Sequence, residues 1–148
     1  MRDFNEVRVF VDHMRIEHSH LDSAVQKIEA DLHEKPDSAQ VRGALVQLRD
    51  TVARHFDEEE AGGCLEEAAC RCPSLAHDVT LIEREHPEML KRLDQLIARA
   101  TQGCDGNSNV GFVESFARFA TTLRAHEAAE TRILEQAFGT AIVDVDVN

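Results

Sequence analysis

Residues 54–60 read RHFDEEE, and this stretch contains the pattern that decides the fold. His55 and Glu59 are four residues apart, a spacing that places both side chains on the same face of an α-helix. A second pair, His126 and Glu130, repeats the spacing near the C-terminal end of the chain. The stretch therefore has a counterpart in the second half of the sequence.

Four stretches of the chain carry apolar residues at intervals of three and four, which predicts four amphipathic helices. These stretches are residues 4–32, 41–59, 75–96 and 112–133. Both His/Glu pairs fall on the apolar faces, and so do the single histidines His18 and His86. Each predicted helix therefore directs a histidine toward the core.

Sharp breaks bound the first two helices. Pro36 and Asp37 indicate a tight turn, after which Asp37 or Ser38 can cap the second helix. That helix is predicted to end at Gly62 and Gly63, where a left-handed backbone costs little.

The second half has less clear boundaries. Residues 64–73 are predicted to be an irregular link, with Ser74 capping the third helix, and residues 103–109 are predicted to be a loop rich in glycine and asparagine. Pro87 lies inside the third helix. A proline there costs about 3 kcal/mol in an ordinary helix, so a kink is predicted beside His86.

The two halves of the sequence repeat one another. Glu17 and His18 are echoed by Glu85 and His86, and the two His/Glu pairs are separated by nearly the same offset. The repeat and the short connections predict an all-α, up-down-up-down antiparallel four-helix bundle built from a duplicated helical hairpin. Within each hairpin, the histidines of the two helices lie about equally far from the turn, so all four should meet in one layer.

Length and composition favour one small domain. The 148 residues are enough for a single core, here about residues 5–138, followed by a tail (139–148) whose end is predicted to fray or to form a short strand. The net charge of −12 argues against nucleic acid as a partner, and the chain lacks an apolar run of membrane-spanning length. Four cysteines are too few for a disulfide scaffold, so we expect reduced thiols and a cytoplasmic protein.

Six polar side chains in one buried layer require compensation, because an unpaired buried polar group costs roughly 1–3 kcal/mol. Four imidazoles and two carboxylates exceed the four ligands of a tetrahedral zinc ion, and they suit two metal ions that share the carboxylates. Nitrogen and oxygen ligands without thiolate favour iron, with manganese or zinc less favoured. A purely structural polar layer is the opposing interpretation.

Other histidines and acids fall off the apolar faces. His20 would replace His18 if the first helix were rotated, and the glutamates on either side of Glu59, Glu58 and Glu60, are interpreted as a charged face. A zinc site formed by Cys64, Cys70, Cys72 and His77 is a weaker hypothesis, because the spacing matches no well-formed zinc knuckle.

The order and spacing of the six layer residues resemble the hemerythrin-like (HHE cation-binding) family over about residues 5–138. The resemblance implies two non-haem iron ions joined by an oxo or hydroxo bridge. It assigns nitrogen ligation to His18, His55, His86 and His126, and bridging of the two irons to Glu59 and Glu130.

One position departs from the oxygen-carrying members, which have a further histidine where this chain has Ile82. Four histidines instead of five leave coordination positions open, which argues against oxygen transport and favours binding of, or reaction with, O2, H2O2 or NO. Turnover, for example peroxide decomposition, is left open, and Glu58 or Glu85 is a candidate proton relay. The alternatives are an iron or oxygen sensor that signals through a protein partner, and an iron donor.

Overall fold

The computed structural model describes residues 3–34, 37–102 and 106–139, and within these ranges it contains helices and no strand. The elements are α1 (Phe4–His33), α2 (Ser38–Gly62), α3 (Cys64–Arg71), the 3-10 helix η1 (Pro73–Leu75), α4 (Ala76–Thr101) and α5 (Gly106–Phe138). The predicted all-α class is confirmed. No helix in these ranges is long and apolar enough to cross a membrane.

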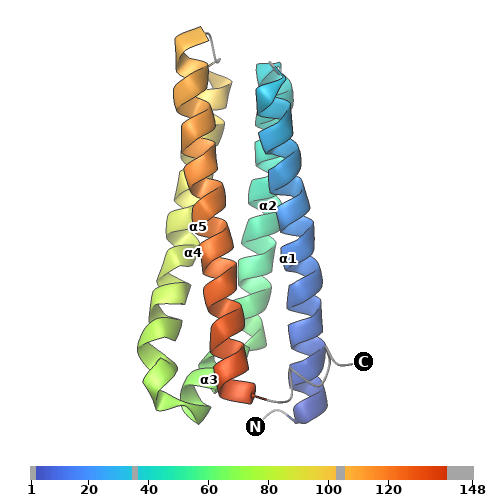
Figure 1. Cartoon of the computed structure of the whole chain (residues 1–148), viewed down its shortest axis with the longest axis vertical. Coiled ribbons are helices and arrows are strands. Elements are labelled where there is room, and N and C mark those ends of the chain that lie inside the picture. Colours follow the sequence, from blue (N-terminus) through green and yellow to red (C-terminus); the bar gives the residue numbers. More distant parts are fainter. Residues whose placement is uncertain (1–2, 35–36, 103–105, 140–148) are drawn as a thin grey trace.

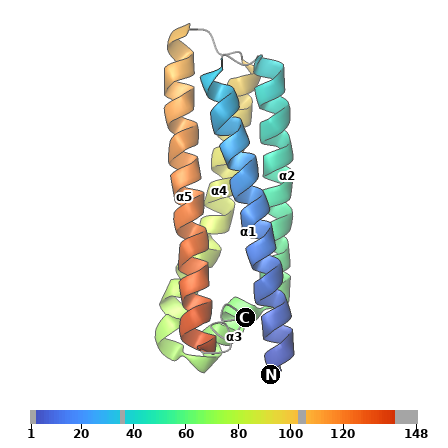
Figure 2. The same cartoon turned by 45° about the vertical axis from the view of Figure 1, so that its right-hand side comes forward.

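The four long helices, α1, α2, α4 and α5, lie side by side along the long axis of the molecule (Figures 1 and 2). They contact one another in a ring, α1 with α2, α2 with α4, α4 with α5, and α5 with α1. The short helix α3 lies at one end, where it packs mainly against α5 and α4 (Figure 1). Each long helix thus has two long neighbours and turns one face toward a shared interior.

The boundaries of α2 confirm the sequence prediction. The Asp37 carboxylate accepts a hydrogen bond from the backbone N–H of Ala39 at 3.2 Å, so Asp37 is the N-cap. At the other end Gly63 has φ 70°, a left-handed conformation that glycine adopts without a steric penalty.

Three other boundaries differ from the prediction. Residues 64–71 form α3 instead of an irregular link, because Leu65 and Ala68 are buried on one face of a short amphipathic helix. Ser74 does not cap α4, which begins at Ala76 without a side-chain cap. Residues 106–109, predicted to belong to a loop, lie in α5, which begins at Gly106, while residues 103–105 lie outside the described residues.

Two sequence predictions concern other parts of the chain. Residues 140–148, predicted to fray or to form a strand, lie outside the described residues. The α4 helix continues through Pro87, whose side chain is exposed, and the predicted kink there stays a prediction.

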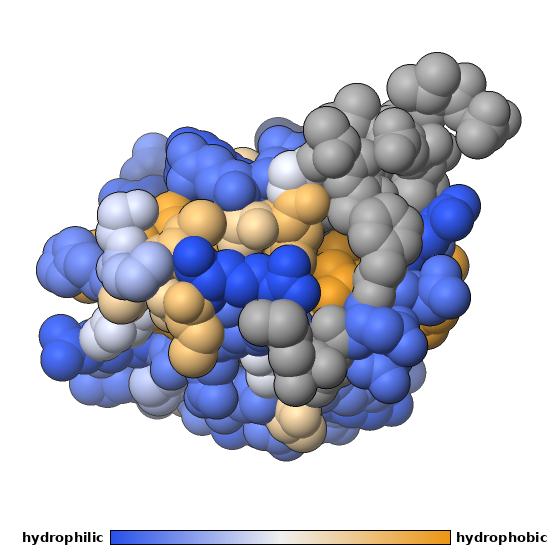
Figure 3. Space-filling model, turned by 90° about the horizontal axis from the view of Figure 1, so that it is seen from below, coloured by the Kyte–Doolittle hydropathy of each residue, from blue (hydrophilic) through white to orange (hydrophobic). Residues whose placement is uncertain are grey.

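The apolar core is divided into two clusters. The long-helix cluster fills the part of the interior away from α3, and its members include Phe56, Phe112, Phe116, Phe119, Met89 and Leu93. The α3-end cluster contains Val7, Val11, Met14, Leu65, Ile82, Ile133 and Leu134, among others. Seen from the α3 end, apolar surface lies among hydrophilic side chains (Figure 3). In α1, α4 and α5, the histidine of the predicted site falls between residues of the two clusters, whereas His55 of α2 follows residues of the long-helix cluster alone.

Candidate metal centre

The six predicted side chains come together in the layer between the two apolar clusters. All four long helices contribute, with His18 from α1, His55 and Glu59 from α2, His86 from α4, and His126 and Glu130 from α5. Five of them are buried to 3% exposure or less. His18 is the exception, with 13% of its side chain exposed, so the layer is least enclosed on the α1 side.

The ligand atoms form two overlapping sets, and within each set they all lie within 4.8 Å of one another. One set is His18, His55, Glu59 and Glu130, and the other is Glu59, His86, His126 and Glu130. Each set thus has two histidines of its own, while both glutamates belong to the two sets at once. This arrangement suits a pair of cations with two shared carboxylates, and a single ion would leave two imidazoles unused.

The atoms at the centre of the layer are close together without being hydrogen bonded. His55 Nε2 lies 2.5 Å from Glu59 Oε1, His126 Nε2 lies 2.6 Å from Glu130 Oε1, and His86 Nε2 lies 3.3 Å from Glu59 Oε2. Yet all four carboxylate oxygens and the Nε2 atoms of the four histidines are buried, and none finds a hydrogen-bond partner among the described residues. Lone pairs converge on one space, as the ligands of a cation do.

The two shared carboxylates have opposite protonation preferences. Burial raises the pKa of Glu59, but the imidazoles of His18, His55 and His86 outweigh it and hold the pKa well below its ordinary value. Burial and the negative charge of Glu59 raise the pKa of Glu130 well above its ordinary value. Without a cation, two adjacent buried carboxylates cannot both remain charged. A bound cation would allow both to ionise.

The histidines also differ from one another. Burial disfavours the charged form of His55, but Glu59 and Glu17 more than offset this and raise its pKa to about 9. For His126 burial dominates, with help from the neighbouring imidazoles, and the pKa falls to about 3 despite the charge of Glu59. The proton that His55 retains at neutral pH therefore occupies a position that a cation would take.

Two further carboxylates contact the imidazoles through Nδ1, the ring nitrogen that points away from the centre of the layer. Glu17 of α1 is in hydrogen-bonding contact with Nδ1 of His55, and Glu60 accepts from Nδ1 of His86 at 2.9 Å. Such partners fix the orientation of an imidazole and direct its other nitrogen, Nε2, toward a metal ion. Glu60, which the sequence assigned to a charged face, therefore belongs to the site.

The internal repeat of the sequence could have identified Glu17 as one of these partners. Glu17 precedes His18 and contacts His55, while Glu85 precedes His86 and has Oε1 3.6 Å from Nδ1 of His126. The glutamate before each single histidine thus reaches the paired histidine of the neighbouring helix in both halves.

Phe56 is a further residue of the layer that sequence reasoning missed. Its ring stacks on the imidazole of His86, with centroids 4.0 Å apart and an angle of 9° between the planes. It also meets the His126 ring at 60°, with centroids 5.4 Å apart. Phe56 thereby restricts rotation of both imidazoles of one set and brings them into contact with the long-helix cluster, to which it belongs.

The other residues considered from the sequence lie elsewhere. His20 is exposed, so α1 is not rotated to replace His18 with it. Glu58 contacts His13 at 3.1 Å at the surface and is not among the six converging side chains. Within the described ranges, the cysteines of α3 and its end do not gather with His77 into a set of ligands.

A small cavity adjoins the layer on its less enclosed side. It lies between α1 and α5 beside His18, and Val11, Met14, Thr131 and Leu134 line it. Its volume of about 10 Å³ is close to that of one water-sized molecule. Ile82, which stands where the oxygen-carrying hemerythrins have a further histidine, is buried in the α3-end cluster, and the open coordination position stays a prediction.

Comparisons with models of known protein families, with curated proteins and with solved structures found no match to this chain. Inference about function therefore depends on the geometry of the layer.

Proposed function

We propose that this chain is a hemerythrin-like protein that holds two iron ions and binds or reacts with a small molecule such as O2, H2O2 or NO. Its fold would be an up-down-up-down four-helix bundle derived from a duplicated hairpin, which the ring of helix contacts supports. The observation that carries the proposal is the membership of Glu59 and Glu130 in both sets of ligand atoms.

The donor set of the chain fits this pair of ions. Four neutral imidazoles and two carboxylates are the nitrogen and oxygen ligands that iron accepts, and no thiolate belongs to either set. Two divalent cations would also compensate both carboxylates and replace the proton that His55 otherwise retains. Manganese or zinc would satisfy the same charges, so iron is the more specific part of the proposal.

When bound, the two ions would supply open coordination positions and redox electrons for a small oxidant. The protein would position them through Glu17 and Glu60, which hold His55 and His86 in a fixed orientation. The apolar clusters on both sides would exclude bulk water.

Access and proton supply would both come from the α1 side. The cavity beside His18 admits a molecule no larger than a few atoms. The surface residue His13 contacts Glu17 at 3.0 Å and Glu58 at 3.1 Å, and Glu17 contacts His55. This chain of polar groups would carry protons between solvent and the layer, with Glu58 at its outer end.

Metal analysis and absorption spectroscopy test the proposal on protein produced in iron-replete medium. The chain has no tryptophan or tyrosine, so its own ultraviolet absorption is weak and an iron chromophore should stand out. We expect two iron ions per chain and a near-ultraviolet band that changes when H2O2 is added. Protein that is folded, contains less than one iron ion per chain and lacks the band would rule out the di-iron centre.

A further inference from the structure

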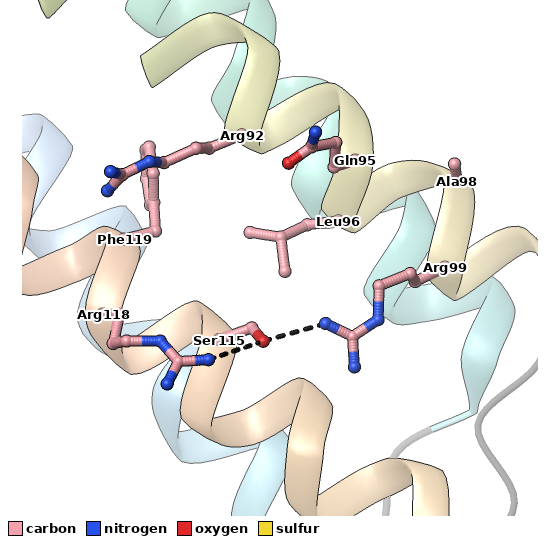
Figure 4. A pocket seen from close by; sticks show the side chains of 8 residues that line it. All are labelled: Arg92, Gln95, Leu96, Ala98, Arg99, Ser115, Arg118 and Phe119. Carbon is pink, nitrogen blue, oxygen red and sulfur yellow. Dashed lines mark hydrogen bonds between the residues drawn. The ribbon is translucent and has the colours of Figure 1, made fainter. Parts of the chain in front are cut away.

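A groove between α4 and α5 is lined by three arginines, Arg92, Arg99 and Arg118 (Figure 4). Its volume is about 570 Å³, within the range of roughly 300–1,000 Å³ typical of small-molecule sites. The groove is separate from the metal centre. Arg92 lies six residues beyond His86 along α4, which corresponds to about 9 Å of helix axis, and Arg99 lies about 10 Å farther.

None of the three guanidinium groups has a carboxylate partner among the described residues. Arg92 donates to the Thr122 hydroxyl at 3.1 Å, and Arg99 donates to the Ser115 hydroxyl at 2.8 Å. Elsewhere in this acidic chain, arginines such as Arg124 are neutralised by ion pairs. Hydroxyl groups orient the groove arginines and leave their charge uncompensated.

Two of these charges are held beside each other. Arg99 and Arg118 both donate to the same oxygen, Ser115 Oγ, at 2.8 and 3.3 Å, so their guanidinium groups point to one spot from two helices (Figure 4). Like charges repel, and a single neutral hydroxyl cannot compensate two of them. Arg99 is further fixed by its position over the Phe112 ring, 5.5 Å from the centroid. Each guanidinium keeps donors available for an anion.

We propose that this groove binds a small organic phosphate. Arginine pairs suit phosphate because a planar guanidinium donates two parallel hydrogen bonds to its oxygens. The phosphate would lie between Arg99 and Arg118, and the organic part would extend toward Arg92 over the apolar floor formed by Leu96 and Phe119. With a net charge of −12, the chain would repel anionic membranes and nucleic acid, so the soluble form of the ligand is favoured.

Calorimetric titration of the full-length chain tests this site with adenosine 5′-monophosphate, adenosine and inorganic phosphate as probes. We expect the monophosphate to bind one molecule per chain, adenosine not to bind, and inorganic phosphate to bind more weakly than the nucleotide. The double variant Arg99→Gln/Arg118→Gln should weaken binding of the monophosphate at least tenfold, because it removes two charged donors. Bound nucleotide should also protect Arg99 and Arg118 from modification by phenylglyoxal.

The matched control is Arg8→Gln/Lys91→Gln, which removes the same charge at exposed positions outside the groove. It should change the affinity less than about threefold. The proposal is overturned if the nucleotide does not bind, or if the two double variants weaken nucleotide binding equally. It is also overturned if only phosphatidic acid vesicles bind, which would assign the arginines to a lipid headgroup. Circular dichroism of each variant verifies that the fold is intact.

Discussion

Glu60 Oε1 lies 2.9 Å from Nδ1 of His86, so an exposed carboxylate orients a histidine that is only 3% exposed. The neighbour of Glu60 in the chain, Glu59, approaches Nε2 of the same ring. Two consecutive residues of α2 thus contact opposite sides of one imidazole.

Replacing Glu60 with glutamine should weaken iron binding by about tenfold or more, because a neutral amide supports the ligand less strongly than a carboxylate does. Competition with a coloured chelator measures the affinity. Glu58→Gln is the control, since it removes the same charge two residues away and contacts His13 instead of a ligand. Equal loss in the two variants would mean that surface charge matters and that the Glu60 contact does not.

The shared carboxylates predict unequal metal contents in two variants. His86→Ala removes a ligand from one set and leaves the other set complete, so about one iron ion per chain should remain. Glu130→Gln changes a ligand of both sets and should reduce the content well below one. Elemental analysis of the two folded variants measures their iron content. Similar iron contents in the two variants would contradict a shared role for Glu130.

The metal-free protein should lose stability as the pH rises from about 6.5 to 9. The fold raises the pKa of His55 from its ordinary value of 6.5 to about 9. The stabilisation that protonated His55 contributes is therefore complete below pH 6.5, and it is lost as the pH rises through the pKa of the folded state. The loss amounts to at most a few kcal/mol. Urea unfolding at several pH values measures it.

The matched variant for this titration is Glu17→Gln, which removes one of the two carboxylates that raise the pKa of His55. In this variant, the free energy of unfolding should depend less strongly on pH between 6.5 and 9. In iron-loaded protein the dependence should be weaker still, because a metal ion holds His55 in its neutral form at every pH in this range. An unchanged slope in both samples would show that other groups control the titration.

Two glycines of α2 should respond oppositely to alanine. A Cβ at Gly43 meets nothing within 4 Å, so Gly43→Ala should stabilise the helix by about 0.5–1 kcal/mol. A Cβ at Gly62 would come within 2.4 Å of the Phe10 ring, so Gly62→Ala should destabilise the fold by roughly 1–3 kcal/mol. Urea unfolding compares the two. Stabilisation by both would show that Phe10 moves aside without loss.

Periodicity was sufficient to predict the four long helices and the residues that meet in the layer, because burial of an apolar face determines both. On this basis alone, Glu59 could be chosen over Glu58 and Glu60 as the glutamate that shares a helix face with His55. The same reasoning missed Glu60 and Phe56, whose importance comes from contacts between helices. It also missed α3, which is too short for a long apolar repeat and packs its buried face against α5 and α4.

The layer of polar residues divides the apolar core in two, and this division affects how the molecule unfolds. Without cations, the layer between the α3-end cluster and the long-helix cluster contains buried polar atoms that find no hydrogen-bond partner among the described residues. That end would open as a separate unit and expose α3 to proteases, while the long-helix cluster stays folded. Bound cations would join the two units into one cooperative structure. The occupancy of the centre would then determine how long the protein survives in a cell, independently of any chemistry at the metal.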